Sequence, residues 1–256
     1  MKKVYQTPLY YEIAFSFMDI KKQIDCFERI IDKFSKIKAK RFLDIACGPS
    51  LQLREIARRG YEAVGLDLSG EMLNYLKKEA KKENLSIETI KSSMYRFKLK
   101  KKADFAFIML GSLTPGSNKE FLKHLDSVAD SLNKGGLYLI QNHMFDISGI
   151  EKPLSWTEKR GKISVKTTYV GKIKNVLDQS LREYISLDVN DNGRKRSYSH
   201  FKDFKYISPQ EFKLLVEKSK FEFVGWYPGD CNEWHLNRKL EKEKDVNMNI
   251  VLLRRK

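Results

Sequence analysis

Short apolar segments and amphipathic helical segments take turns along the chain as far as position 140. Between the apolar segments, apolar residues recur every three or four positions, as they do on the buried face of a helix. Parallel strands need a crossover between them, and a helix usually supplies it. The alternation therefore predicts an α/β protein with a doubly wound, Rossmann-like sheet. Its first five strands are expected at 41–46, 63–67, 87–90, 105–110 and 137–140.

The pattern changes after the fifth strand. No helical period is visible from about position 155 to 206, and polar and apolar residues alternate at 163–170 and 181–187. Asn192-Gly193 marks a hairpin turn, because both residues tolerate a positive φ. We therefore expect a seven-stranded, mostly parallel sheet from 1–152 and 207–256. An antiparallel β insertion, 153–206, should lie between strand five and the following helix.

Several residues have the chemistry of helix ends. Ser117 with Glu120 predicts a capping box, and Ser208, followed by Pro209 and Glu211, predicts another helix start. Gly60 and the pair Gly135-Gly136 are expected to end helices. The last two strands should lie at 221–227 and 249–253.

The chain is strongly basic, with a formal net charge of +16. Such a charge attracts polyanions, so nucleic acid is a conceivable partner. The lysines are spread along the chain and interleaved with glutamates, which favours the simpler interpretation of solvated helix faces. Nucleic acid is therefore a possible partner that the charge pattern does not favour.

No window has the run of about 20 apolar residues that a membrane span needs. The N-terminus has two lysines but no apolar segment behind them, so we expect no signal peptide, no membrane association and a cytoplasmic protein. The cysteines (Cys26, Cys47 and Cys231) and the histidines (His124, His143, His200 and His235) lack the spacing of metal ligands, and no metal is expected.

The turn after the first strand has the features of a nucleotide site. Asp44 to Ser50 would lie at the carboxyl end of that strand, where open α/β sheets bind ligands. Gly48 would let the backbone approach a ligand. Asp67 ends the second strand, and its carboxylate can accept hydrogen bonds from two ribose hydroxyls. Gly48 stands alone, so the glycines of a dinucleotide site are missing, and so is a P-loop lysine. A nucleoside without phosphates fits best.

At this point the sequence resembles the class I S-adenosylmethionine (SAM) dependent methyltransferases. The segment 43–48 (LDIACG) resembles their first motif, 64–69 (VGLDLS) with Met72-Leu73 their second, and 132–136 (LNKGG) the turn before their fifth strand. The resemblance covers roughly the first 145 residues with ordered motifs, and SAM is the cofactor that it implies.

The resemblance also implies residue roles. Asp44, Ala46 and Gly48 would contact the methionine part of SAM. Asp67 would hold the ribose, and Leu68 would pack on the adenine. Ser93 and Met94 lie where the family usually has an aspartate near the adenine amino group, and a serine there can still form a hydrogen bond. The end of strand four would lie beside the sulfonium and the acceptor; its residues are Leu110 and Gly111.

The segment after strand four argues against two nucleic-acid chemistries. Residues 109–115 (MLGSLTP) lack the Asn/Asp-Pro-Pro-aromatic motif of enzymes that methylate base amines. No Pro-Cys pair, as in cytosine C5 enzymes, occurs in the chain. These two nucleic-acid chemistries therefore lose support, and the family resemblance implies transfer by in-line displacement to an N or O atom of a small molecule. The alternatives are an RNA methyltransferase and a non-catalytic SAM- or RNA-binding protein.

The insertion, with the segment 10–12 (YYE), resembles small-molecule enzymes that include amino-sugar N-methyltransferases and glycine N-methyltransferase-like enzymes. In the amino-sugar group a His-Phe-x-Asp stretch ends the insertion, which here is 200–203. The resemblance implies that the insertion covers the acceptor pocket and often forms a homodimer contact. Tyr11 would line the cofactor pocket, and Tyr198 and His200 are candidate catalytic residues. The aromatic segment 225–235 would either edge the acceptor pocket or pack Trp226 into the core.

Overall fold

The computed structural model describes residues 4–141, 149–230, 232–238, 240 and 249–256. Seven strands form the main sheet, in the order β10-β11-β5-β4-β1-β2-β3. The pairs among β1 to β5 are parallel, whereas β11 runs antiparallel to β5 and to β10. The predicted seven-stranded, mostly parallel sheet is confirmed. Its strands are β1 (Arg41–Ile45), β2 (Glu62–Asp67), β3 (Ile87–Lys91), β4 (Ala103–Ile108), β5 (Leu132–Gln141), β10 (Phe221–Pro228) and β11 (Asn249–Arg255).

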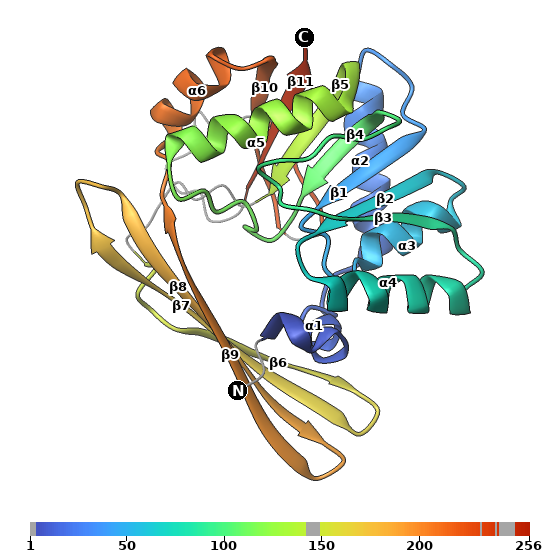
Figure 1. Ribbon diagram of the computed structural model, residues 1–256, viewed down its shortest axis with the longest axis vertical. Coiled ribbons are helices and arrows are strands. Elements are labelled where there is room, and N and C mark those ends of the chain that lie inside the picture. Colours follow the sequence, from blue (N-terminus) through green and yellow to red (C-terminus); the bar gives the residue numbers. More distant parts are fainter. Residues whose placement is uncertain (1–3, 142–148, 231, 239, 241–248) are drawn as a thin grey trace.

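Helices cover both faces of this sheet (Figure 1). Successive strand side chains point to opposite faces. Leu43 therefore joins a core with α5 and α6, while Phe42 joins another core with α2, α3 and α4. The helices of this layer are α2 (Ile20–Phe34), α3 (Leu51–Arg58), α4 (Gly70–Lys82), α5 (Asn118–Ser131) and α6 (Pro209–Glu217). None of the helices in the described part of the chain is both long and apolar enough to cross a membrane.

Three of the expected helix ends differ in detail from the structure. The Ser117 side chain caps α5 as predicted, but the Glu120 carboxylate accepts from the Gly116 amide, at 2.7 Å, rather than from Ser117. Ser208 forms no side-chain cap bond with the described residues, although Pro209 does begin α6. The helix before Gly135 already ends at Ser131, and β5 starts directly after it.

The predicted antiparallel insertion is a separate sheet of four strands in the order β6-β7-β8-β9, of which the sequence pattern had not indicated β6. Its strands are β6 (Leu154–Arg160), β7 (Ile163–Asn175), β8 (Ser180–Asp191) and β9 (Arg194–Lys205). Asn192 and Gly193 have φ of 51° and 86° and form the expected hairpin turn.

The N-terminal elements pack on this second sheet. They are the short helix η1 (Val4–Gln6) and α1 (Pro8–Ala14). Val4 and Ile13 are fully buried in a cluster with Leu187 of β8 and Tyr198 of β9. As a result, η1 and α1 lie between the insertion sheet and α4 (Figure 1). The sequence pattern had not indicated this placement.

Candidate functional site

The turn after β1 is held in an unusual backbone conformation. Ala46, Gly48 and Ser50 all have positive φ, at 56°, 55° and 30°. This region suits glycine, and other residues adopt it at a cost of about 1–2 kcal/mol. A Cβ on Gly48 would meet only the Tyr11 ring, at 3.8 Å. The need for glycine there is therefore conformational, and the space for a ligand comes from the turn as a whole.

Asp67 closes this turn from the end of β2. One carboxylate oxygen accepts from the Gly48 amide at 2.8 Å, and the other accepts from the Ser69 amide at 2.7 Å. Ser69 in turn caps α4 by accepting from the Met72 amide. Burial raises the pKa of Asp67, and its backbone hydrogen bonds act against that rise. Asp67 thus ties the first two motifs together and keeps lone pairs for a further donor.

Asp44 lies deeper, at the end of β1. It is 4% exposed, and the Ser50 hydroxyl donates to it at 2.6 Å. Ser50 also caps α3 by accepting from the Leu53 amide at 3.0 Å. Burial raises the pKa of Asp44 to about 8, although the Ser50 hydrogen bond lowers it. A buried carboxyl of this kind is suited to receive a cationic ligand group.

Two neighbouring cavities open at these strand ends. The larger, of about 470 Å³, lies beside Asp67, and the smaller, of about 60 Å³, lies beside Asp44. Tyr11, Ala46, Gly48 and Ser112 line both. Of the predicted cofactor residues, the larger cavity brings together Tyr11, Ala46, Gly48, Asp67, Leu68, Ser93 and Met94, and the smaller adds Asp44 and Leu110.

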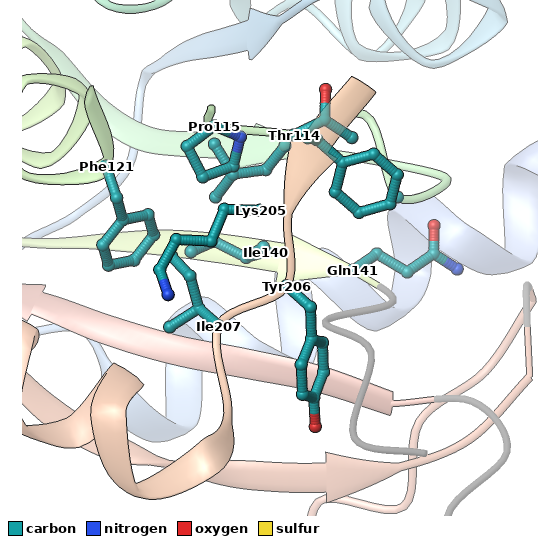
Figure 2. Close-up of a pocket in the computed structure, with 11 residues that line it drawn as sticks. Thr114, Pro115, Phe121, Ile140, Gln141, Lys205, Tyr206 and Ile207 are labelled. Atoms are coloured by element: carbon teal, nitrogen blue, oxygen red, sulfur yellow. The ribbon is translucent and has the colours of Figure 1, made fainter. Parts of the chain in front are cut away.

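Gly111 lines a third, small hollow of about 30 Å³. Figure 2 shows Thr114, Gln141 and Tyr206 around it. The Gln141 side-chain oxygen accepts from the Leu110 amide at 3.1 Å, which helps to hold Leu110 and Gly111 at positive φ. The Nε2 of Gln141 is buried and has no partner among the residues that the structure describes.

The two candidate catalytic residues of β9 lie in different places. His200 lines the larger cavity and packs edge-on against Tyr5, with ring centroids 4.8 Å apart. Tyr198 is 6% exposed and packs against Tyr10 in the cluster between α1 and the insertion sheet. Tyr198 is absent from the residues that line the larger cavity, whereas Lys202 is among them.

Three aromatic rings, those of Tyr5, Tyr11 and His200, line the larger cavity together. The centroids of the Tyr5 and Tyr11 rings are 5.8 Å apart, and the Tyr5 carbonyl oxygen accepts a hydrogen bond from the Ser69 hydroxyl at 3.1 Å. Burial raises the pKa of Tyr11, and the neighbouring Tyr5 and Asp67 add to that rise. Both phenols are therefore protonated at neutral pH and can donate hydrogen bonds.

The sequence pattern missed several lining residues, including Tyr5, Gln6, Tyr95 and Lys202. Tyr5 and Gln6 come from η1, which no periodicity marked. Lys202 is two positions after His200 in β9, so alternation could have placed it on the same face. In the described part of the chain no group of three or more His, Cys, Asp or Glu side chains could hold a metal ion. His143 and Cys231 lie outside the described residues.

The aromatic segment after β10 packs into the core. Trp226 is 5% exposed and lies against Phe212 and Phe223. Trp234 is 2% exposed and stacks on Phe27. Of the two interpretations of this segment, the packing role of Trp226 is the one found.

Comparisons with known proteins agree with this geometry. Residues 42–136 match a sequence family described as a methyltransferase domain. The ubiquinone biosynthesis O-methyltransferase of Pelagibacter ubique (strain HTCC1062) is 28% identical over 134 residues, which are 47% of this chain and 52% of that protein. The chain thus spans about half the length of the curated relative that it matches.

Solved structures share the fold over nearly the whole chain. A SAM-dependent methyltransferase from Clostridium acetobutylicum ATCC 824 has a TM-score of 0.75 at 14% identity, and covers 96% of each chain. A SAM-bound amino pentose methyltransferase from Micromonospora echinaspora has a TM-score of 0.71 at 16% identity, over 100% of this chain and 98% of that one. A sugar N-methyltransferase from Streptoalloteichus sp ATCC 53650 has a TM-score of 0.73 at 15% identity, over 100% and 94%.

The predicted fold and the motifs of 42–136 are therefore confirmed by independent findings. Residues 42–136 thus match a methyltransferase domain, and the chain has the fold of solved SAM-dependent methyltransferases.

Proposed function

We propose that this chain binds SAM across the two neighbouring cavities and transfers its methyl group to an N or O atom of a small molecule. The observation that carries the proposal is the pair Asp44 and Asp67. They lie at adjacent strand ends, in different cavities that share the Gly48 turn. This spacing provides separate acceptors for a cationic amino acid group and for a ribose.

The cofactor residues follow from that placement. Asp44, Ala46 and Gly48 hold the methionine part in the smaller cavity, with Leu110, which also lines it, beside the sulfonium. Asp67 accepts from the ribose hydroxyls. The adenine lies between Leu68, which is 71% exposed without a ligand, and the wall of Ser93 and Met94. An exposed leucine at a cavity edge gains stability when a flat base covers it.

Bound SAM supplies an activated methyl group, and the work left to the protein is alignment. Tyr11 lines both cavities and so lies where the two halves of the cofactor meet. An amine acceptor must arrive neutral, and a hydroxyl acceptor benefits from a nearby proton acceptor. His200 faces the cavity and is the candidate for that second role, while Tyr198 supports the strand from within the hydrophobic cluster.

The aromatic lining of the larger cavity supports a small-molecule acceptor. Tyr5, Tyr11 and His200, from η1, α1 and β9, line the cavity with aromatic rings, and a cavity of about 470 Å³ has the dimensions of a small-molecule site. The structural neighbours include enzymes named for sugar and amino pentose substrates. The net charge of +16 favours the second candidate, an RNA methyltransferase or RNA-binding protein.

Two measurements test the proposal. Calorimetry with S-adenosylhomocysteine should show binding that changes little with salt, because the ligand is buried; RNA binding would weaken steeply. Incubation with methyl-labelled SAM and either fractionated metabolites or total RNA should transfer label to a metabolite fraction. Absence of S-adenosylhomocysteine binding would overturn the cofactor assignment, and label in RNA alone would overturn the small-molecule acceptor.

A further inference from the structure

His124 is fully buried in α5, yet both of its ring nitrogens have polar partners. Nδ1 lies 2.9 Å from the Met94 carbonyl oxygen, and Nε2 lies 2.6 Å from the Tyr138 hydroxyl. A carbonyl oxygen can only accept, so Nδ1 carries the proton, and Nε2 accepts from Tyr138. Burial lowers the pKa of His124 to about 4, which keeps the ring neutral at physiological pH.

Met94 belongs to the wall of the larger cavity, together with Ser92, Ser93 and Tyr95. This wall carries no charged side chain, and the Ser93 hydroxyl already accepts from the Tyr95 amide at 3.3 Å. A flat, uncharged base beside it would be recognised by the placement of short polar groups and backbone. Small displacements of the wall would therefore weaken binding.

Three hydrogen bonds hold the wall from different directions. The Ser92 amide donates to the Asp67 carbonyl, and the Tyr95 hydroxyl donates to the Thr114 carbonyl at 2.9 Å. His124 reaches the wall from behind, from a helix whose other buried residues pack on the sheet. Its second bond, to Tyr138 of β5, fixes the ring orientation. The two successive hydrogen bonds from Tyr138 to His124 and from His124 to Met94 thus connect a strand of the main sheet to the cavity wall.

We infer that His124 is a positioning residue, which sets the Ser92–Tyr95 wall for the adenine end of the cofactor. This inference rests on the proposed function, because it takes the adenosine to lie beside Ser93 and Met94. His124 does not line the cavity, so its effect on binding passes through the Met94 carbonyl.

Two matched substitutions separate the two bonds of the ring. In His124→Asn the amide nitrogen replaces Nδ1 and can still donate to Met94. In His124→Gln the longer amide reaches the place of Nε2 and keeps the bond to Tyr138 instead. Affinity is measured by calorimetry with S-adenosylhomocysteine and with 5′-methylthioadenosine, which lacks the amino acid part. Thermal unfolding shows that each variant is folded.

We expect His124→Gln to weaken both ligands about tenfold, the effect of one lost hydrogen bond, and His124→Asn to stay within about threefold of wild type. In turnover assays the KM for SAM should rise in His124→Gln while kcat at saturating SAM is retained. Equal losses of affinity in both variants would show that His124 acts only through general packing. Wild-type affinity in both would show that His124 has no role in binding. Either result overturns the inference. A tenfold loss of affinity in His124→Asn, with the variant folded, would be enough to overturn the inference. Absence of binding to wild type would instead refute the proposed cofactor.

Discussion

The main sheet and the insertion sheet meet at one cavity but contribute to it in different ways. The main sheet supplies backbone geometry: a turn with three positive φ values, two capped helices and the Asp67 carboxylate bonded to two amides. The insertion sheet supplies side chains from one face of a regular strand. His200 and Lys202 reach the cavity, while Tyr198 on the same face packs against α1.

The difference shows what each side depends on. The cofactor side is set within short stretches of sequence, because turns and caps are local features. The opposite side depends on register, since β9 faces the cavity only while Tyr198 pairs with Leu187 and His200 with Ile185. A slip of one residue would turn both side chains to the other face. We therefore expect backbone changes to damage the main sheet most, and side-chain changes to reveal the role of the insertion.

The largest contrast should come from two glycines. A Cβ at Gly136 would lie 2.4 Å from the Asp104 carbonyl oxygen of β4, and backbone cannot move aside cheaply. We expect Gly136→Ala to lower the free energy of unfolding by about 3 kcal/mol. Gly193, in the hairpin turn of the insertion, has φ of 86° and open space around it, so Gly193→Ala should cost about 1 kcal/mol. Urea unfolding measures both, and equal losses would contradict the contrast.

Next in size is the loss of cofactor affinity in Asp67→Ala. The alanine removes the acceptor for the ribose and also frees the amides of Gly48 and Ser69. Hydrogen bonds to charged groups contribute about 1.5–3 kcal/mol each, so S-adenosylhomocysteine should bind at least about a hundredfold more weakly. Glu71 lines the same cavity from α4, and Glu71→Ala is the matched control, with an expected change of less than about threefold. Unchanged calorimetric affinity in Asp67→Ala would refute the ribose assignment.

A smaller and more selective effect should follow from His200→Ala. Loss of one acceptor contact should lower kcat/KM for the acceptor about tenfold, with S-adenosylhomocysteine affinity within about threefold of wild type. If His200 also takes up a proton, the loss in kcat extends to about a hundredfold or more. His235 is exposed and lies outside the cavity lining, so His235→Ala should leave both values unchanged. Wild-type acceptor kinetics in His200→Ala would show that His200 has no role in the reaction.

The same division explains what the sequence could predict. The Asp44–Ser50 turn, Asp67 and the Asn192-Gly193 hairpin were predictable because each depends on residues close in sequence. Tyr5 and the bond from His124 to Met94 were not. Tyr5 comes from a three-residue helix with no period to detect, and His124 meets Met94 only through the packing of α5. Tyr198 and His200 share a face by alternation, and only the placement of α1 separates the buried residue from the one at the cavity.

The smallest expected effect concerns a single proton at Asp44. Its pKa is raised to about 8, mainly by burial, so the carboxyl is largely protonated at pH 7 in the free protein. A cationic amino group bound beside it favours the charged form, and binding of S-adenosylhomocysteine at pH 7 should release up to about one proton.

Calorimetry at pH 7 in two buffers of different ionisation enthalpy measures that proton, and Asp44→Asn should release none. The raised pKa also sets the sign for stability. The folded state holds this proton more tightly than the unfolded state, so the contribution of Asp44 is complete below the ordinary aspartate pKa of 3.8 and is lost as pH rises through about 8. Asp44→Asn, which resembles the protonated acid, should lack that decline. If the binding enthalpy does not depend on the buffer, the amino acid group of the ligand does not bind beside Asp44. The proposed division of the cofactor between the two cavities would then be wrong.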